Sequence, residues 1–402
     1  MNKIYYGRAV YDKKEISAVI NVLKNHSYTL IDGPHVKKLE KKVSKIFGKK
    51  YGLMVNSGSS ANLLALNALN FKKGSEIITP SLTFSTTVAP IYQLGLKAHF
   101  VGVLKNKFIV DPDQIEACIN KNTVAILIPN LLGNIPDWIK LNKIAKKYNL
   151  KIIEDSADTI GYKINNKIYG MLSDITTNSF YASHIINGAG SGGIVCFNDY
   201  KLYQKAKLLR GWGRSSATFN ESEKIEHRFN VKISGIQYDK KYIFSNFGYN
   251  FLPSEISAAF AIEQIKKLKK NILLRERNFK FLKNYFKKYS NYFNLPESYK
   301  NIKTPWLAFP LVIKKNKKFD RRKLQIFFEK NKIQTRTIFT GNILKQPIMK
   351  NIKYKKHKKT DTEADNVMKN GILIGCHQGL TKSDLKMICI KFEKFYKIYK
   401  LK

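Results

Sequence analysis

The segment Ser179-Phe180-Tyr181-Ala182-Ser183-His184, followed by Gly188-Ala189-Gly190-Ser191-Gly192-Gly193, joins two short apolar runs of the sequence. The runs, at residues 176–181 and 193–197, have the length and composition of buried strands. His184 stands just before the glycine-rich turn, and its imidazole can move protons near neutral pH. A histidine in such a turn is more often a structural hydrogen-bonding residue than a catalyst. The segment alone therefore leaves both roles open.

Strand-like and helix-like segments alternate on both sides of this turn. Helical patterns cover residues 13–23 and 36–47, and an apolar helix that ends near Leu69 follows the polar turn at 56–62. Short apolar runs, typical of strands covered by helices on both faces, lie at 51–55, 76–79, 98–103, 124–129 and 151–154. This alternation predicts an α/β fold with a mostly parallel sheet.

The length of the chain indicates two domains. A chain of 402 residues exceeds the roughly 250–300 residues at which a single hydrophobic core stops growing. From Pro253 a long amphipathic helical pattern leads into a second unit, where strand-like segments near 306–313 and 335–339 alternate with helices. We expect a large domain at 1–265 and a smaller C-terminal α/β domain at 266–402. The lysine-rich stretch 350–359 predicts a solvated loop.

The formal net charge is +43, from 72 Lys and Arg against 29 Asp and Glu. Because the lysines are spread over nearly every segment without an arginine-rich stripe or a nucleic-acid motif, we expect no nucleic-acid partner. The positive field instead raises the encounter rate with anionic small molecules. The four cysteines lack metal-ligand spacing, and no apolar stretch reaches the length of about 18 residues that a membrane helix needs. These features predict a cytoplasmic protein without a metal site or a membrane partner.

Two further segments carry polar groups where α/β sheets bind ligands. Ser57-Gly58-Ser59-Ser60 lies between a strand and a helix, so its backbone N–H groups and hydroxyls would form an anion site. Asp155 ends an apolar strand, at the edge where open α/β sheets place ligand-binding groups. A carboxylate buried there needs a partner such as a protonated pyridine nitrogen, because an unpaired buried charge is costly. Taken singly, a helix cap without a ligand and a loop aspartate explain the two segments equally well.

The order of these motifs resembles the DegT/DnrJ/EryC1/StrS sugar aminotransferase family over nearly the whole chain. The matching segments are Ser57 to Ser60, Thr83-Phe84-Ser85-Thr86-Thr87, Asp155, Ser179 to His184, and Gly248-Tyr249-Asn250. The resemblance implies a fold-type I enzyme, like aspartate aminotransferase, with bound pyridoxal 5′-phosphate (PLP). Phe84 would stack on the PLP ring, Asp155 would pair with its pyridine nitrogen, and Ser59 and Ser179 would hold the phosphate. The implied cofactor-binding set is Gly58, Ser59, Phe84, Asp155, Asp158, Ser179, Ser183 and, from the partner subunit of a homodimer with shared active sites, Asn250.

His184 occupies the position where the family usually has a lysine bound covalently to PLP. An imidazole cannot form that bond, so we expect a cofactor held non-covalently, as PLP or as its pyridoxamine form (PMP). Histidine at this position is typical of the family's nucleotide-sugar 3-dehydratases, which the chain also resembles at 130–134, 211–214, 340–342 and 370–378. This implies that His184 is the catalytic residue that removes the C3 hydroxyl of a GDP-linked 4-keto-6-deoxy hexose or heptose. Glutamate would be consumed as the amino donor and ammonia released, in the synthesis of a surface polysaccharide.

The resemblance also implies substrate-binding roles for Arg336, Asn342 and His377, although structural roles explain these residues equally well. A second histidine branch of the family uses an iron–sulfur cluster, which we do not expect because residues 215–247 contain no cysteine. Two alternatives stay open. One is a nucleotide-sugar 4-aminotransferase that works without the lysine, and the other is a non-catalytic homologue that has kept only the fold.

Overall fold

The computed structural model describes residues 3–25, 30–165, 170–219 and 224–400 of the chain. Its main sheet has eight strands in the order β1-β8-β7-β5-β4-β2-β3-β14. Neighbouring strands are parallel except at β8, which runs antiparallel to both β1 and β7. The strands are β1 (Tyr51–Val55), β2 (Glu76–Pro80), β3 (Lys97–Val101), β4 (Thr123–Pro129), β5 (Lys151–Asp155), β7 (Ile175–Ser179), β8 (Gly193–Phe197) and β14 (Lys355–Lys356). The predicted α/β class with a large, mostly parallel sheet is confirmed.

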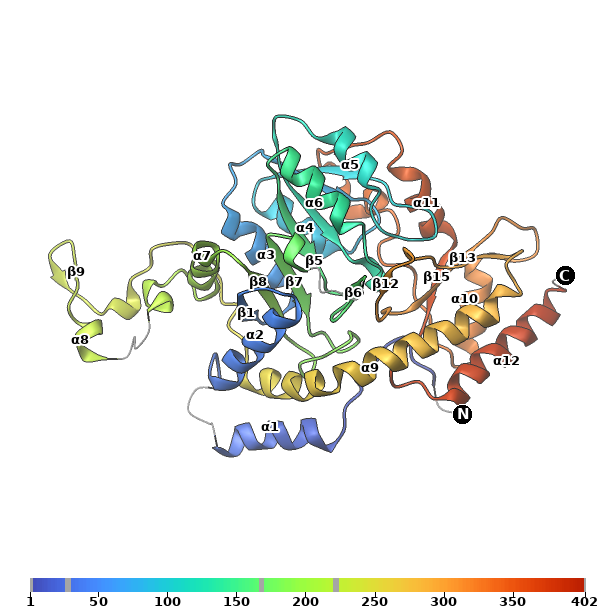
Figure 1. The fold of residues 1–402 in the computed structure, drawn as a ribbon, viewed down its shortest axis with the longest axis horizontal. Helices are drawn as coiled ribbons and strands as arrows, with labels where there is room; N and C mark the ends of the chain where they lie inside the picture. Colours follow the sequence, from blue (N-terminus) through green and yellow to red (C-terminus); the bar gives the residue numbers. More distant parts are fainter. Residues whose placement is uncertain (1–2, 26–29, 166–169, 220–223, 401–402) are drawn as a thin grey trace.

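Helices cover both faces of this sheet because alternate strand residues point to opposite sides. Along β4, Ala125 and Leu127 belong to one buried cluster, whereas Ile126 and Ile128 belong to another. The first cluster includes residues of α3 (Gly58–Leu69), α4 (Ser85–Gln93) and α7 (Tyr200–Arg210). The second includes residues of α2 (Pro34–Ile46), α5 (Pro112–Cys118), α6 (Trp138–Lys147) and the start of α9 (Glu255–Lys287). Helix α1 (Lys13–Asn25) lies along α9 (Figure 1).

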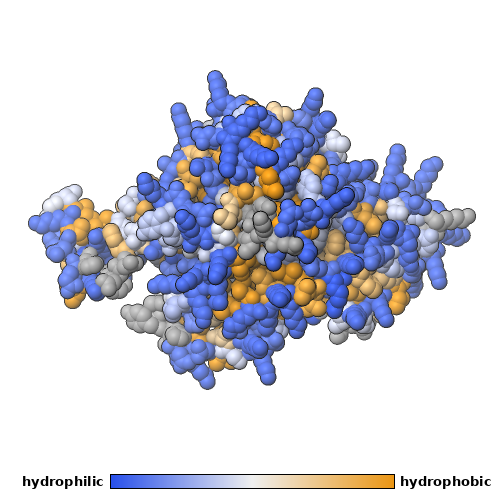
Figure 2. All heavy atoms as spheres, viewed as in Figure 1, coloured by the Kyte–Doolittle hydropathy of each residue, from blue (hydrophilic) through white to orange (hydrophobic). Residues whose placement is uncertain are grey.

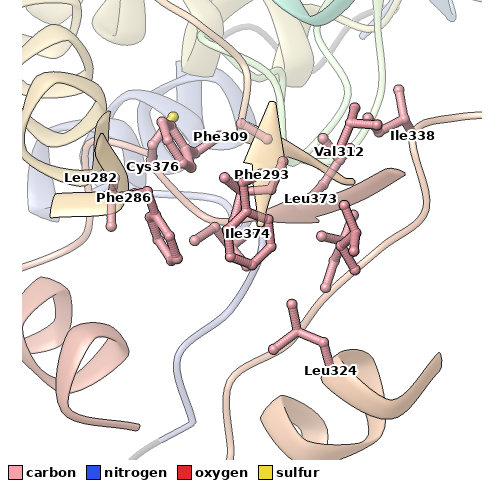
Figure 3. Packing of buried hydrophobic residues seen from close by; sticks show 14 of the residues in the cluster. Leu282, Phe286, Phe293, Phe309, Val312, Leu324, Ile338, Leu373, Ile374 and Cys376 are labelled. Atoms are coloured by element: carbon pink, nitrogen blue, oxygen red, sulfur yellow. The ribbon is translucent and has the colours of Figure 1, made fainter. Parts of the chain in front are cut away.

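The C-terminal part of the chain builds a second, smaller core around an antiparallel sheet. This sheet contains β11 (Phe293–Asn294), β13 (Phe309–Ile313) and β15 (Gly371–Ile374), and it is accompanied by α10 (Arg321–Lys330), α11 (Asp361–Asn370) and α12 (Lys382–Ile398). Figure 3 shows Phe286 of α9 packed near Phe293 and Ile374 in this core. Because α9 also contributes Ala258 to the main-sheet core, the expected boundary at residue 265 falls inside one continuous helix. The division at 265/266 stays a prediction.

One local prediction for the C-terminal part was wrong, and a second was right only in part. Residues 335–339 form no strand, because only an isolated bridge joins Arg336 to Leu373 and Phe339 turns the backbone to φ +46°. The stretch 350–359 is not a loop throughout, because β14 extends the edge of the main sheet at β3. The Lys355 ammonium lies 2.5 Å from the buried Glu76 carboxylate, and this ion pair fixes the strand there. A further short pair joins β6 (Lys163–Ile164) to β12 (Ile302–Lys303).

An arm formed by residues 211–219 and 224–247 projects away from α7, on the left of Figure 1. Within residues 211–219 and 224–247, it carries α8 (Ile225–Arg228), β9 (Lys232–Ile233) and β10 (Ile236–Gln237). Its two ends pass so closely that a Cβ on Gly213 would lie 1.9 Å from the Asn246 carbonyl oxygen. Figure 2 shows hydrophobic side chains exposed on the arm, and Phe244 and Phe247 are among those that face solvent. The arm therefore leaves apolar surface uncovered in a single chain.

Three further properties concern only the residues that the structure describes. Their helices include none with an apolar stretch long enough to cross a bilayer. Their His, Cys, Asp and Glu side chains form no group of three or more that could hold a metal ion. The four cysteines, Cys118, Cys196, Cys376 and Cys389, are buried and unpaired.

Candidate active site

A cleft of 890 Å³ opens at the carboxyl ends of β1, β2, β4, β5 and β7. Parallel strands end on the same edge of a sheet, so the turns that follow them meet there. Nine of the twelve predicted site residues line this cleft: Gly58, Ser59, Phe84, Asp155, Asp158, Ser179, Ser183, His184 and Arg336. Side chains separated by up to 278 positions in the sequence therefore share one cavity.

Three predicted site residues, Asn250, Asn342 and His377, do not line the cleft. Asn250 is exposed at the base of the arm, where it pairs with Gly211. The buried Asn342 amide donates to Asp361 and Asp365, both at 2.8 Å.

His377 is also held in a structural role. Its Nε2 lies 3.1 Å from the Tyr5 carbonyl oxygen, and its Nδ1 accepts from the Gly379 N–H at 3.2 Å. Burial lowers its pKa to about 3, so the ring stays neutral. Its ring nitrogens, like the amide of Asn342, are already engaged, so neither side chain is free to bind a substrate of this cleft.

The turn before α3 forms an anion cradle at one end of the cleft. Ser57 caps the helix by accepting from the Ser60 N–H at 3.0 Å, which leaves the N–H groups of Gly58 and Ser59 without intrahelical partners. A Cβ on Gly58 would lie 2.5 Å from the Ser179 Cβ, so only glycine lets the helix N-terminus approach the end of β7 this closely. N–H groups without helical partners, the positive end of the helix dipole and the nearby hydroxyls suit a phosphate group.

Asp155, at the end of β5, presents a buried carboxylate to the cleft. Its Oδ2 accepts from Asn62 Nδ2 at 2.8 Å and from Thr87 Oγ1 at 2.9 Å, and its Oδ1 accepts from the Ala157 N–H at 3.2 Å. Burial raises the pKa of this carboxyl, and these three donors lower it only in part. No cationic side chain pairs with Asp155 in the described parts of the chain. The site thus suits a ligand that brings its own cationic N–H group.

His184 faces the cleft with a basic nitrogen. Its Nδ1 lies 3.3 Å from the Ser179 carbonyl oxygen, which can only accept, so Nδ1 carries the proton and Nε2 is left as the base. Burial lowers the pKa of His184 to about 4, and the charge of Arg275 acts in the same direction. The imidazole is therefore neutral at pH 7.

Asp158 lies opposite, with its Oδ1 3.9 Å from His184 Nε2 and its Oδ2 accepting from the Leu132 N–H at 2.8 Å. Burial, assisted by the charge of Asp155, raises its pKa to about 8. Because burial favours the uncharged form of both His184 and Asp158, the two do not form an ion pair. Their separation is also too long for a direct hydrogen bond.

Comparison with known proteins decides the family. The model of the DegT/DnrJ/EryC1/StrS aminotransferase family matches residues 10–393. The chain belongs to this family. Lipopolysaccharide biosynthesis protein RfbH of Salmonella typhimurium is 34% identical to it over 368 residues, which span 89% of this chain and 84% of that protein. GDP-4-keto-6-deoxy-D-mannose 3-dehydratase of Escherichia coli is 33% identical over 384 residues, which span 92% and 94% of the two chains.

A solved structure is also similar to this chain over nearly its whole length. It is a GDP-4-keto-6-deoxymannose-3-dehydratase with a trapped PLP–glutamate geminal diamine, and it matches this member of the DegT/DnrJ/EryC1/StrS family with a TM-score of 0.86. The two chains are 30% identical, and the match covers 96% of this chain and 99% of the other. The similarity therefore includes the small C-terminal core as well as the main sheet.

This family member also has cleft residues that the sequence analysis missed. Asn62 and Thr87 hold Asp155, and the polar Asn62 within the otherwise apolar run from Ala61 to Leu66 was a signal that could have indicated it. Phe339 meets Phe84 edge to face, with 5.9 Å between the ring centroids. Tyr6 comes from the N-terminal segment, and its ring centroid lies 5.9 Å from Cζ of Arg336. No local sequence motif predicts this contact.

Proposed function

We propose that this protein is a PLP/PMP-dependent 3-dehydratase that removes the C3 hydroxyl of a GDP-linked 4-keto-6-deoxy sugar for a surface polysaccharide. The observation that carries the proposal is a neutral histidine, His184, at the cofactor-lysine position of an otherwise complete site. The names of relatives that are 33–34% identical over most of the chain support both the reaction and its place in polysaccharide synthesis. No lysine lines the cleft within the described residues, so no described side chain there could replace the missing covalent anchor.

The cleft residues suggest how the cofactor would be held. Its phosphate would lie in the anion cradle, against the N–H groups of Gly58 and Ser59 and the hydroxyl of Ser179. The pyridine N–H would supply the cationic partner that Asp155 lacks, and the half-exposed ring of Phe84 would cover one face of the cofactor. Asp158 and Ser183 would complete the pocket. When bound, the cofactor supplies an electron sink for the removal of a proton and a leaving group from the attached substrate.

His184 would then carry out the two proton transfers of the reaction, which are the removal of a proton from the attached substrate and the protonation of the leaving group. Its neutral Nε2 would accept the first proton, because the Ser179 carbonyl holds the other ring nitrogen in its protonated form. The resulting imidazolium would give a proton to the departing C3 hydroxyl, which leaves as water. Arg336, a permanent cation in the same cleft, would bind an anionic group of the nucleotide sugar or of glutamate.

The stoichiometry requires glutamate as the reductant. The sugar loses one oxygen atom overall, while glutamate becomes 2-oxoglutarate and releases its nitrogen as ammonia. The test is to incubate the protein with PLP, glutamate and GDP-4-keto-6-deoxymannose and to measure both products. Dehydration predicts equal amounts of ammonia and 2-oxoglutarate.

Other outcomes of this assay contradict the proposal. A 4-aminotransferase would form 2-oxoglutarate without ammonia, because the nitrogen stays on the sugar. An absence of turnover with this substrate, with a heptose analogue and with a CDP-linked sugar would favour a non-catalytic homologue. The His184→Gln variant is the matched control, and it should release no ammonia above background.

We further propose a cytoplasmic homodimer in which each active site is completed by Asn250 of the partner subunit. Asn250 is exposed, lies outside the cleft of its own chain, and sits at the base of the arm. The apolar side chains on the arm would be covered by a second copy, which would remove them from water. Four unpaired cysteines are typical of a reducing compartment.

A further inference from the structure

Arg275, on α9, is a fully buried arginine whose contacts are with neutral groups. Its Nε donates to Gln378 Oε1 at 2.7 Å, and its Nη1 donates to the carbonyl oxygens of Trp306 and Leu307 at 3.1 and 3.0 Å. Its Nη2 lies 3.5 Å from the carbonyl oxygen of His184. In the described parts of the chain no carboxylate pairs with it, although a buried charge is normally paired. This arrangement needs a reason beyond packing.

A series of hydrogen bonds leads from Arg275 to the carboxyl opposite the proposed active-site base. Leu307, whose carbonyl receives Arg275, donates its own N–H to the Leu132 carbonyl oxygen at 2.8 Å. The Leu132 N–H in turn donates to Asp158 Oδ2 at 2.8 Å, and Asp158 Oδ1 faces His184 Nε2. One guanidinium therefore contacts the backbone of His184 directly and reaches the opposing carboxyl through three successive hydrogen bonds, by way of Leu307 and Leu132.

The charge of Arg275 also acts on the imidazole of His184. Burial lowers the pKa of Arg275 to about 10, so the guanidinium remains a cation at neutral pH. The other titratable or charged groups of the cleft are Asp158, across from His184 with Asp155 beside it, Tyr181 on the same loop, and Tyr6 and Arg336. With Asp158 uncharged by burial, the charge of Arg275 adds to burial in lowering the pKa of His184.

We propose that Arg275 is a positioning residue that holds the backbone of His184 and keeps a positive charge beside it, so that the base stays aligned and neutral. The proposal rests on the proposed function of His184 as the proton-transferring group. A residue that only stabilised the fold would lower the stability of the protein when replaced, without changing the protonation of one histidine.

The first test follows His184 itself by NMR, in full-length protein with ¹³C- and ¹⁵N-labelled histidine and without sugar substrate. The His184→Gln variant identifies its signal among the seven histidines. In the wild type the ring should titrate near pH 4. Arg275→Gln, which keeps amide donors but removes the charge, should move the midpoint upward, whereas Arg275→Lys should leave it close to the wild-type value. Arg277→Gln, on the exposed side of the same helix, is the matched control and should change nothing.

Two results of this titration would overturn the proposal. One is a folded Arg275→Gln protein in which His184 titrates as in the wild type. The other is a wild-type midpoint at the ordinary histidine value of about 6.5, a measurement that needs no variant. Because the titration requires no turnover, it tests Arg275 even if the dehydratase assay fails.

The second test separates position from charge in the PLP-loaded enzyme. A lysine at position 275 keeps the charge but cannot bridge Gln378, Leu307 and His184 together, because an ammonium lacks the planar fork of a guanidinium. Arg275→Lys should therefore lower kcat by roughly 10- to 100-fold, with KM for the sugar and for glutamate within about twofold of the wild-type values. An unchanged kcat in this variant would refute the positioning role.

Discussion

His184 and Asp158 face each other at 3.9 Å, and burial keeps both uncharged near neutral pH. His184 can accept a proton only while its imidazole is unprotonated. Because the Asp158 carboxyl opposite is itself protonated, it carries no negative charge that would stabilise the imidazolium. Environments that push the pKa values of two neighbouring groups away from their ordinary values are typical of active sites. The same burial explains why His184 and Asp158 stay uncharged, whereas the two groups of a surface ion pair would both be charged.

Replacement of His184 by lysine restores the amine that can bond covalently to PLP. We expect the His184→Lys variant to retain PLP as a covalent mass increase after borohydride reduction, which the wild-type protein does not show. Dehydration should fall by about 10²- to 10⁴-fold, the range that a positioned general acid–base contributes. Intact-protein mass spectrometry and the ammonia assay measure the two effects. Undiminished dehydration by this variant would remove His184 from the mechanism.

Asp158 makes the stability of the cofactor-free protein depend on pH. Its pKa in the folded state, about 8, lies above its ordinary value of 3.8, so between these values the folded state binds more protons than the unfolded state. The contribution of this group is complete below pH 4 and is lost as the pH rises toward 8. Asp158→Asn has no such proton to lose, so its unfolding free energy relative to the wild type should rise from pH 5 to pH 8 by on the order of 4 kcal/mol. Urea unfolding at both pH values tests this, and a difference that does not change with pH would contradict it.

Sequence motifs predicted the position of a site residue where its neighbours in the fold are close to it in the sequence. They did not predict it where those neighbours are distant in the sequence. Ser57 to Ser60 and Ser179 to His184 lie in turns that directly follow strands, so their position at the edge of the sheet follows from the strand pattern. For Asn342 and His377 the sequence left a substrate-binding role and a structural role equally open. Their hydrogen bonds come from residues as distant as Tyr5, and this pairing is fixed only when the chain has folded.

Among the elements, the turn between β7 and β8 stores backbone strain at a residue other than glycine. Ala189 has φ +54°, a region where an L side chain costs about 1 kcal/mol or more, and it is exposed in the structure. Ala189→Gly should therefore raise the free energy of unfolding by about 0.4–1 kcal/mol, measured by urea unfolding. Ala182→Gly in the same loop, where φ is not positive, is the control and should give no gain. Equal effects of the two substitutions would show that Ala189 is not strained.

Element boundaries were predictable where an apolar run is bounded by turn residues on both sides. The strands at 51–55 and 193–197 match the prediction, and so does the end of α3 at Leu69. The segment 335–339 was misassigned because its β-branched residues favour a strand, whereas positive φ at Phe339 and Gly341 turns the chain toward the cleft. Strand β14 escaped prediction because its pairing depends on Glu76, far away in the sequence.

For the whole molecule, the proposed sharing of active sites predicts complementation between two inactive variants. His184→Gln and Asn250→Ala should each be inactive alone. When the two proteins are unfolded together and refolded in equal amounts, half of the dimers are mixed and each mixed dimer carries one intact site. About a quarter of the wild-type activity should then return. No recovery, in a mixture that sedimentation shows to be dimeric, would indicate that Asn250 acts within its own chain or not at all.

The central claim is that this protein is a dehydratase rather than an aminotransferase, and the mass of its sugar product tests that claim most directly. The protein is incubated with PLP, glutamate and GDP-4-keto-6-deoxymannose, and the nucleotide sugar is analysed by high-resolution mass spectrometry beside a His184→Gln reaction. The account predicts a product lighter than the substrate by one oxygen atom and free of added nitrogen, formed only by the wild type. A product that keeps its C3 oxygen and carries an amino group in place of the C4 ketone would contradict it.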